Sequence, residues 1–215
     1  MQSSASPFAL TLMLAASSMT AAPALFFGPE DLPSLRERVQ ETALAPVWQG
    51  ILERAEKACD PQSGEYADPA NPFTGRAKSA HMDAGRHAAL VVHSIGRRLN
   101  DVMESVGFAY QITGREDLGR HGAAFLHAIA TQYPSTREEV AKGFAGGRGD
   151  VMRGLALGCD WLWDAMSESQ RQEVAEVAKG YLTLFCEEFE NPRSWWYKIH
   201  NYNGVNGGAA GCLAL

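Results

Sequence analysis

The stretch from Met152 to Leu184 decides the fold class; it reads MRGLALGCDWLWDAMSESQRQEVAEVAKGYLTL. Its apolar residues recur every three or four positions, on Met152, Leu155, Cys159, Leu162 and Met166, and then on Val174, Val177, Tyr181 and Leu184. Between the two stripes, Ser167 and Gln170 have the spacing of a capping box, which satisfies backbone N–H groups at a helix start. The stretch therefore predicts two consecutive helices joined by a short turn.

The same periodicity runs through most of the chain after residue 28. It falls on 28–41 (Leu32, Leu35, Val39), 45–59 (Val47, Ile51, Ala55), 100–113 (Val102, Val106, Ala109, Thr113) and from 118 on (Leu118, Gly122, Phe125, Ile129). Gly114 is expected to end a helix, and a loop rich in Pro and Gly is expected from Asp60 to Gly75. No alternating strand pattern competes, so we predict an all-α protein of helix pairs. Such a series forms a bundle, a solenoid or a closed toroid, and the periodicity does not choose between a bundle and a toroid.

Composition limits the function classes. The chain has 215 residues, 46% of them hydrophobic, and a net charge of −6, which suits one substantial core. An acidic chain is a poor candidate for non-specific binding to DNA or an anionic membrane, so we expect no nucleic-acid partner. His81, His87 and His93 are spaced by six residues, the wrong step for one helix face, so we expect neither a metal site nor a cofactor.

The N-terminal stretch PFALTLMLAASSMTAAPA, residues 7–24, is apolar and ends in small residues, with Ala-x-Ala-like sites at Ala22 and Ala24. This pattern is typical of a secretory signal peptide, which we place at residues 1–24. No Lys or Arg precedes Arg36, a departure that a wrongly assigned start codon would explain. The stretch is too short and too rich in Ser and Ala for a membrane span, so we expect a periplasmic or secreted protein.

The C-terminal stretch RSWWYKIHNYNGVNGGAAGCLAL, residues 193–215, has two interpretations. In the first, Asn203 or Asn206 caps a helix and the aromatic rings fill the core. In the second, the rings stack on sugar faces while amides and an imidazole bind hydroxyl and carboxylate groups. A helix N-terminus there would also favour an anionic ligand. Physical arguments alone leave both interpretations open.

The segment HNYNGVNGGAAGCLAL, residues 200–215, resembles the sugar-cleft segment of the heparinase II/III-like polysaccharide lyases and their alginate lyase relatives. Three other segments resemble the same superfamily, in the same order along the chain: LFFGPEDLPSLRERV (25–39), AYQITGREDLGRHGAAFL (109–126) and LALGCDWLWDAMSESQRQEV (155–174). The resemblance implies that residues 25–215 are the N-terminal part of an incomplete (α/α) toroid, followed in the family by a β-sandwich domain.

The implied reaction is β-elimination across a uronic acid linkage in an anionic polysaccharide such as a heparan-like or alginate-like chain. The proton next to the uronate carboxylate is weakly acidic, and hydrogen bonds to that carboxylate stabilise the charge that develops when the proton leaves. A Tyr or His removes the proton, and a Tyr commonly protonates the leaving oxygen. No metal is needed for that role.

The resemblance also assigns roles to residues. Asn203 is our first choice for the group that neutralises the carboxylate, and Asn201 is its rival. His200 lies a step or more from the family's usual His. Tyr202 is a possible proton carrier, although the family's principal catalytic Tyr lies further downstream. The expected substrate-binding residues are Trp195, Trp196, Tyr197 and Lys198.

Further alternatives stay open. The final GGAAGCLAL begins a helix with no capping signal, so we expect the sequence to be a fragment of a longer lyase rather than a genuine short protein. A non-catalytic sugar-binding module is one alternative function. Another is a glycoside hydrolase with two carboxylates drawn from Asp150, Asp160 and Asp164, although Asp164 is expected to end a helix and Asp160 to face a neighbouring one. The RGD triplet at residues 148–150 is interpreted as a chance match in a Gly-rich turn.

Overall fold

The computed structural model describes residues 24–72, 84–141, 145–191 and 201–215, and every regular element in these ranges is helical. The all-α prediction is therefore confirmed. The elements are α2 (Leu32–Arg38), α3 (Ala45–Cys59), α4 (Ala84–Val102), the π-helical turn η2 (Met103–Gly107), α5 (Phe108–Thr113), α6 (Glu116–Gln132), α7 (Glu138–Ala141), α8 (Ala145–Leu162), the 3₁₀ turn η3 (Trp163–Ala165), α9 (Glu168–Glu190) and α10 (Asn201–Ala214).

Two helix boundaries that the sequence predicts are confirmed. Gly114 ends α5 in the left-handed conformation, with φ of 67°, which glycine adopts without steric cost. Ser167 caps α9 and forms a complete capping box with Gln170. The helix expected from Asn100 starts much earlier, at Ala84, and continues through η2 into α5.

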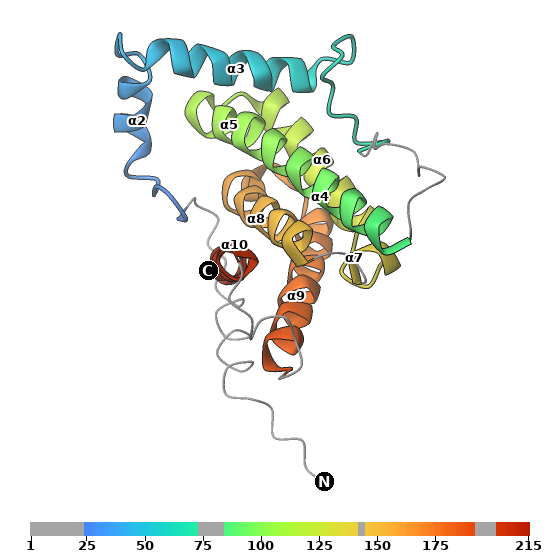
Figure 1. The fold of residues 1–215 in the computed structure, drawn as a ribbon. Helices are drawn as coiled ribbons and strands as arrows, with labels where there is room; N and C mark the ends of the chain where they lie inside the picture. Colours follow the sequence, from blue (N-terminus) through green and yellow to red (C-terminus); the bar gives the residue numbers. More distant parts are fainter. Residues whose placement is uncertain (1–23, 73–83, 142–144, 192–200) are drawn as a thin grey trace.

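Helix α8 occupies the centre of the molecule, with α4 on one side and α10 on another (Figure 1). It also contacts α6 and α9. Glycine allows α4 and α8 to approach closely. A Cβ atom added to Gly96 on α4 would lie 2.5 Å from the Cβ of Asp150 on α8, and one added to Gly154 on α8 would lie 2.5 Å from Leu99 Cγ. The close α4–α8 contact thus depends on residues without side chains.

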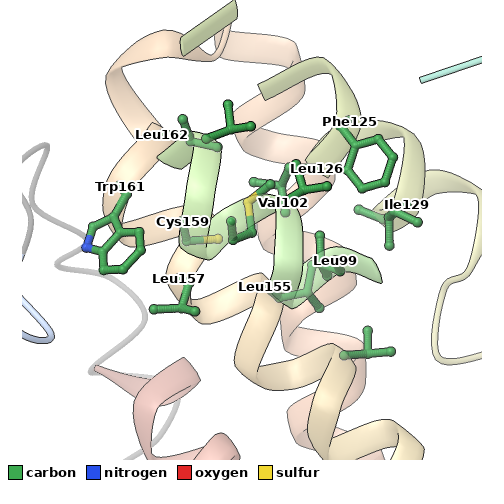
Figure 2. Packing of buried hydrophobic residues seen from close by; sticks show 14 of the residues in the cluster. Leu99, Val102, Phe125, Leu126, Ile129, Leu155, Leu157, Cys159, Trp161 and Leu162 are labelled. Carbon is green, nitrogen blue, oxygen red and sulfur yellow. The ribbon is translucent and has the colours of Figure 1, made fainter. Parts of the chain in front are cut away.

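The core lies where α4, α6 and α8 meet. Leu99, Phe125, Leu126, Leu155 and Leu162 are fully buried in this part of the molecule (Figure 2). The predicted stripe is confirmed, since Met152, Leu155, Cys159 and Leu162 on α8 and Met166 after η3 are all buried. The stripe predicted on α6 is confirmed on Leu118, Gly122, Phe125 and Ile129.

The predicted inner face of α3 is confirmed at Ala55, which is fully buried, and is wrong at Val47. Val47 is 62% exposed, whereas Trp48 is 5% exposed and its ring packs edge-on against Phe108, with centroids 6.1 Å apart. Neighbouring residues on a helix point about 100° apart, so the inward indole turns Val47 outward. Thr113, expected on the inner stripe of α5, is likewise exposed, and Ile112 is buried instead. Among the described helices, none is long and apolar enough to span a bilayer.

Candidate functional site

Helix α10 carries the asparagine-rich phrase that the sequence singled out. It begins at Asn201, so Asn203 lies in its first turn and Asn206 lies further inside. The prediction that Asn203 or Asn206 is the helix cap is therefore wrong. The helix starts before either residue, although the small residues that follow do belong to it.

Asn206 fixes how α10 lies on α8. Asn206 is only 1% exposed. It packs so closely against Gly149 of α8 that a Cβ atom added to Gly149 would collide with Asn206 Oδ1. The same Cβ would lie 3.2 Å from Val205 Cγ1. A helix rises about 1.5 Å per residue, so the backbone of Asn203 lies roughly one turn, about 5 Å, along α10 from this contact. The close contact therefore sets the register of the first turn of α10 on α8.

A small cleft with a cavity volume of about 10 Å³, partly open to solvent, lies between α8, α9 and α10. Its lining residues are Arg148, Met152, Tyr181, Leu184, Phe185, Glu188 and Asn206. Arg148 Nη2 on α8 donates to both carboxylate oxygens of Glu188 on α9, at 2.6 and 2.7 Å. The Arg148 side chain is 8% exposed and that of Glu188 is 28% exposed, so this ion pair is mostly shielded from water. It ties α9 to α8 beside the helix that carries the candidate residues.

Tyr181 is the tyrosine that lines this cleft, and its environment does not suit proton transfer. Its hydroxyl donates a 2.8 Å hydrogen bond to the carbonyl oxygen of Tyr133. Burial raises the pKa of Tyr181, because the phenolate would lose its hydration. The described position of Tyr181 is that of a structural tyrosine which joins α9 to the end of α6.

The structure places the predicted site residues unevenly. Asn201, Tyr202 and Asn203 form the first turn of α10, and the structure describes their backbone only. The remaining predicted residues lie outside the described ranges: Trp195, Trp196, Tyr197, Lys198 and His200. The structure thus gives a helical start for the asparagines and leaves the predicted aromatic wall as an expectation.

Two of the three carboxylates considered for a hydrolase, Asp150 and Asp160, have other engagements, and Asp164 is exposed in the 3₁₀ turn η3. Asp150 Oδ2 lies 3.1 Å from His93 Nδ1 on α4, and Asp160 accepts hydrogen bonds from the backbone of Ala24 and Leu25. Asp160 therefore binds the N-terminal segment rather than facing a neighbouring helix. Asp150 and Asp160 are ten positions apart on one helix, about 15 Å along its axis, which exceeds the separation that glycosidases use.

The RGD triplet also differs from its prediction. Arg148 to Asp150 lie inside α8, not in a turn. Both charged side chains of the triplet are engaged, Arg148 with Glu188 and Asp150 with His93. The triplet is therefore part of the packing between helices.

No family model, no curated protein and no solved structure matches this chain. Within the described ranges, no group of His, Cys, Asp and Glu side chains is arranged to hold a metal ion.

Sequence reasoning missed Arg148, Glu188 and Asn206. A signal for Arg148 was present, since a cation amid Gly and Ala on a helix needs a buried partner. No such signal singled out Glu188, which follows another glutamate on α9. These three polar side chains lie among the apolar side chains of Met152, Leu184 and Phe185 where α8, α9 and α10 meet.

Proposed function

We propose that this chain supplies the helical part of a polysaccharide lyase that cleaves a uronate-containing polysaccharide by β-elimination. The observation that carries the proposal is the place of the asparagine-rich phrase. The phrase that resembles the family's sugar-cleft segment starts α10, and α10 packs on α8 beside a small cleft that Arg148, Glu188 and Asn206 help to line. We extend the all-α fold, as part of the same proposal, to an incomplete (α/α) toroid.

The chemistry sets the demand on Asn203. In β-elimination a base takes the proton from the carbon that bears the uronate carboxylate, and the bond from the next carbon to the glycosidic oxygen breaks. A carbon–carbon double bond forms between the two carbons, and the leaving oxygen accepts a proton. An amide N–H directed at the carboxylate stabilises the charge that develops before the bond breaks. We assign this role to Asn203, with Asn201 as the rival assignment.

The start of α10 suits a group that must hold an anion. The first backbone N–H groups of a helix have no partner within it, and the helix dipole is positive at that end. Asn201 and Asn203 are at this end of α10, so both N–H groups and dipole would favour a bound carboxylate. His200 and Tyr202 are the proton carriers that the proposal assigns within this phrase, and Trp195, Trp196, Tyr197 and Lys198 are its substrate-binding residues.

The contacts that hold the first turn of α10 in place also favour the proposal. A catalytic donor acts through its fixed position, so its helix must not shift during the reaction. Asn206 and Gly149 hold α10 on α8, and the Arg148–Glu188 ion pair holds α9 on α8. We assign these residues a positioning role. The protein would act outside the cytoplasm or in the periplasm, as its N-terminal stretch predicts.

The test is an activity assay with the full-length protein on alginate, heparan sulfate and other uronate polysaccharides, with a neutral glucan as control. The expected result is a rise in ultraviolet absorbance from the unsaturated product on at least one uronate polymer and none on the glucan. New reducing ends without that absorbance would indicate a hydrolase. Binding without cleavage of any polymer would indicate a non-catalytic sugar-binding module. Either outcome would overturn the proposal.

A further inference from the structure

The carboxylate of Asp160, near the end of α8, binds the backbone of the N-terminal segment. Ala24 N donates to Asp160 Oδ1 at 2.7 Å, and Leu25 N lies 3.3 Å from both Oδ1 and Oδ2. A nitrogen equidistant from both oxygens of a carboxylate has the geometry of an ammonium partner as well as of an amide. Among the described residues, no Lys or Arg forms an ion pair with Asp160, so its charge faces neutral donors only.

Aromatic packing holds the same segment in place. The ring of Phe27 stacks on Trp161, with centroids 5.8 Å apart and an interplanar angle of 19°, and contacts Phe108 edge-on at 6.1 Å. The ring of Phe26 lies 6.3 Å from that of Trp161. In Figure 2 the Trp161 indole points away from Leu126 and Ile129, on the side of the helix opposite the main core. The packing of Phe26 and Phe27, which follow Leu25 in the chain, thus holds the Leu25 nitrogen beside Asp160.

The sequence puts a candidate processing site at the same point. Ala22 and Ala24 are the small residues of an Ala-x-Ala pattern, and cleavage after the second alanine would fall between Ala24 and Leu25. A leader peptidase would hydrolyse that bond with one water molecule. The water oxygen joins the carbonyl carbon of Ala24 as that carbon's bond to Leu25 N breaks. Ala24 leaves as a carboxylate with the leader, and the freed Leu25 nitrogen takes up protons to become an ammonium group.

We infer that Asp160 is the binding site for the N-terminal ammonium group created when the chain is cut between Ala24 and Leu25. Processing would exchange two neutral backbone hydrogen bonds for an ion pair at the same carboxylate. In the uncut chain, burial raises the pKa of Asp160, which is the response of a carboxylate that lacks a cationic partner. The cut supplies that partner, so the mature protein gains stability that the precursor lacks. This inference does not depend on the lyase activity.

The experiment compares the whole chain starting at Leu25 with a free α-amino group and the same chain with that group selectively acetylated. Acetylation is possible near neutral pH because lysine side chains stay protonated there. The melting temperature of the free form is expected to exceed that of the acetylated form by about 2–4 °C. In Asp160→Asn the difference is expected to vanish, and in the matched control Asp164→Asn it is expected to persist.

Mass spectrometry of the exported protein supplies the second readout, with Leu25 expected as the first residue. Equal melting temperatures for the free and acetylated forms would overturn the inference. So would a difference that survives in Asp160→Asn, or an exported chain that starts at any residue other than Leu25. If Asp160→Asn fails to fold, Asp160→Ser replaces it, and the free-minus-acetylated difference is expected to vanish there as well. A difference that persists in that uncharged variant would overturn the ion pair.

Discussion

Arg148 Nη2 on α8 donates hydrogen bonds to both carboxylate oxygens of Glu188 on α9, with N–O distances of 2.6 and 2.7 Å. The two residues are forty positions apart in the sequence. Their contact closes one side of the cleft that Asn206 of α10 also lines. Helices α8, α9 and α10 therefore meet where these three polar side chains lie.

Glu188→Gln tests how much this ion pair stabilises the fold. The amide removes the charge but keeps an acceptor, so the free energy of unfolding is expected to fall by about 1–2 kcal/mol. The neighbouring Glu187 is exposed, and Glu187→Gln is expected to change stability by less than about 0.5 kcal/mol. Chemical denaturation of both variants measures this. Equal stability of the two variants would show that the ion pair contributes nothing.

Gly96→Ala tests the close approach of α4 and α8. The added methyl group would lie 2.5 Å from Asp150 Cβ and 2.9 Å from the backbone nitrogen of Val151, so the helices must separate. A loss of about 1–3 kcal/mol is expected. Gly50 on α3 is the matched control, because a Cβ there meets nothing within 4 Å. Gly50→Ala is expected to be neutral or to stabilise by up to about 1 kcal/mol. Thermal unfolding of both variants measures the difference. A Gly96→Ala protein as stable as the wild type would contradict the close packing of α4 on α8.

Ser167→Ala tests the capping box. Ser167 Oγ accepts from the backbone nitrogen of Gln170, and Gln170 Oε1 accepts from the backbone nitrogen of Ser167. Loss of the serine hydroxyl is expected to cost about 1 kcal/mol in the free energy of unfolding. Ser167→Asp keeps an acceptor at the cap, so it is expected to retain most of the stability. Urea denaturation of the two variants distinguishes a capping effect from a general intolerance of substitution.

His121 makes stability depend on pH. Its ring packs against Tyr66 with centroids 5.4 Å apart, and burial lowers the pKa of His121. The unfolded chain then binds a proton below about pH 6.5 that the folded chain does not, so stability is lost as the pH falls through that value. His121→Gln cannot titrate and is expected to lose less stability between pH 7.5 and 5.5. Parallel slopes for the two proteins would contradict this.

The sequence predicts most helices because each buries one stripe, and a stripe is visible in a single segment. The stripe from Met152 to Met166, which runs along α8 and ends just after η3, illustrates this, since every predicted position is buried. Prediction failed where two neighbouring residues competed for one inward position, as with Val47 and Trp48. The first part of α4 was overlooked although Val91, Val92, Ile95 and Leu99 are buried there at helical spacing.

The candidate site was less predictable because its described parts come from distant segments. The contact of Arg148 with Glu188 depends on how α8 and α9 pack, and periodicity carries no information about that. Asn206 was considered only as a helix cap, and its close contact with Gly149 depends on the position of α10. By contrast, a helix in this segment was expected from the cap interpretation and from the family resemblance, although its glycines and asparagines are poor helix formers.

Asn203→Ala is the sharpest test of the proposed chemistry. In the full-length enzyme, this change is expected to lower kcat by about a hundred- to a thousandfold while KM changes little. The reason is that the amide helps most when the proton is leaving and charge moves onto the uronate carboxylate. Asn201→Ala tests the rival assignment in the same assay, which follows ultraviolet absorbance of the unsaturated product.

Trp196→Ala is the contrasting variant in that assay. A ring that stacks on the sugar holds substrate and transition state alike, so this change is expected to raise KM more than it lowers kcat. Circular dichroism of each variant shows whether the helices are retained. If Asn203→Ala keeps near wild-type turnover while folded, Asn203 does not neutralise the carboxylate, and the first turn of α10 is structural. If Asn201→Ala then loses turnover, the role moves by two residues within the same turn and the β-elimination chemistry stands.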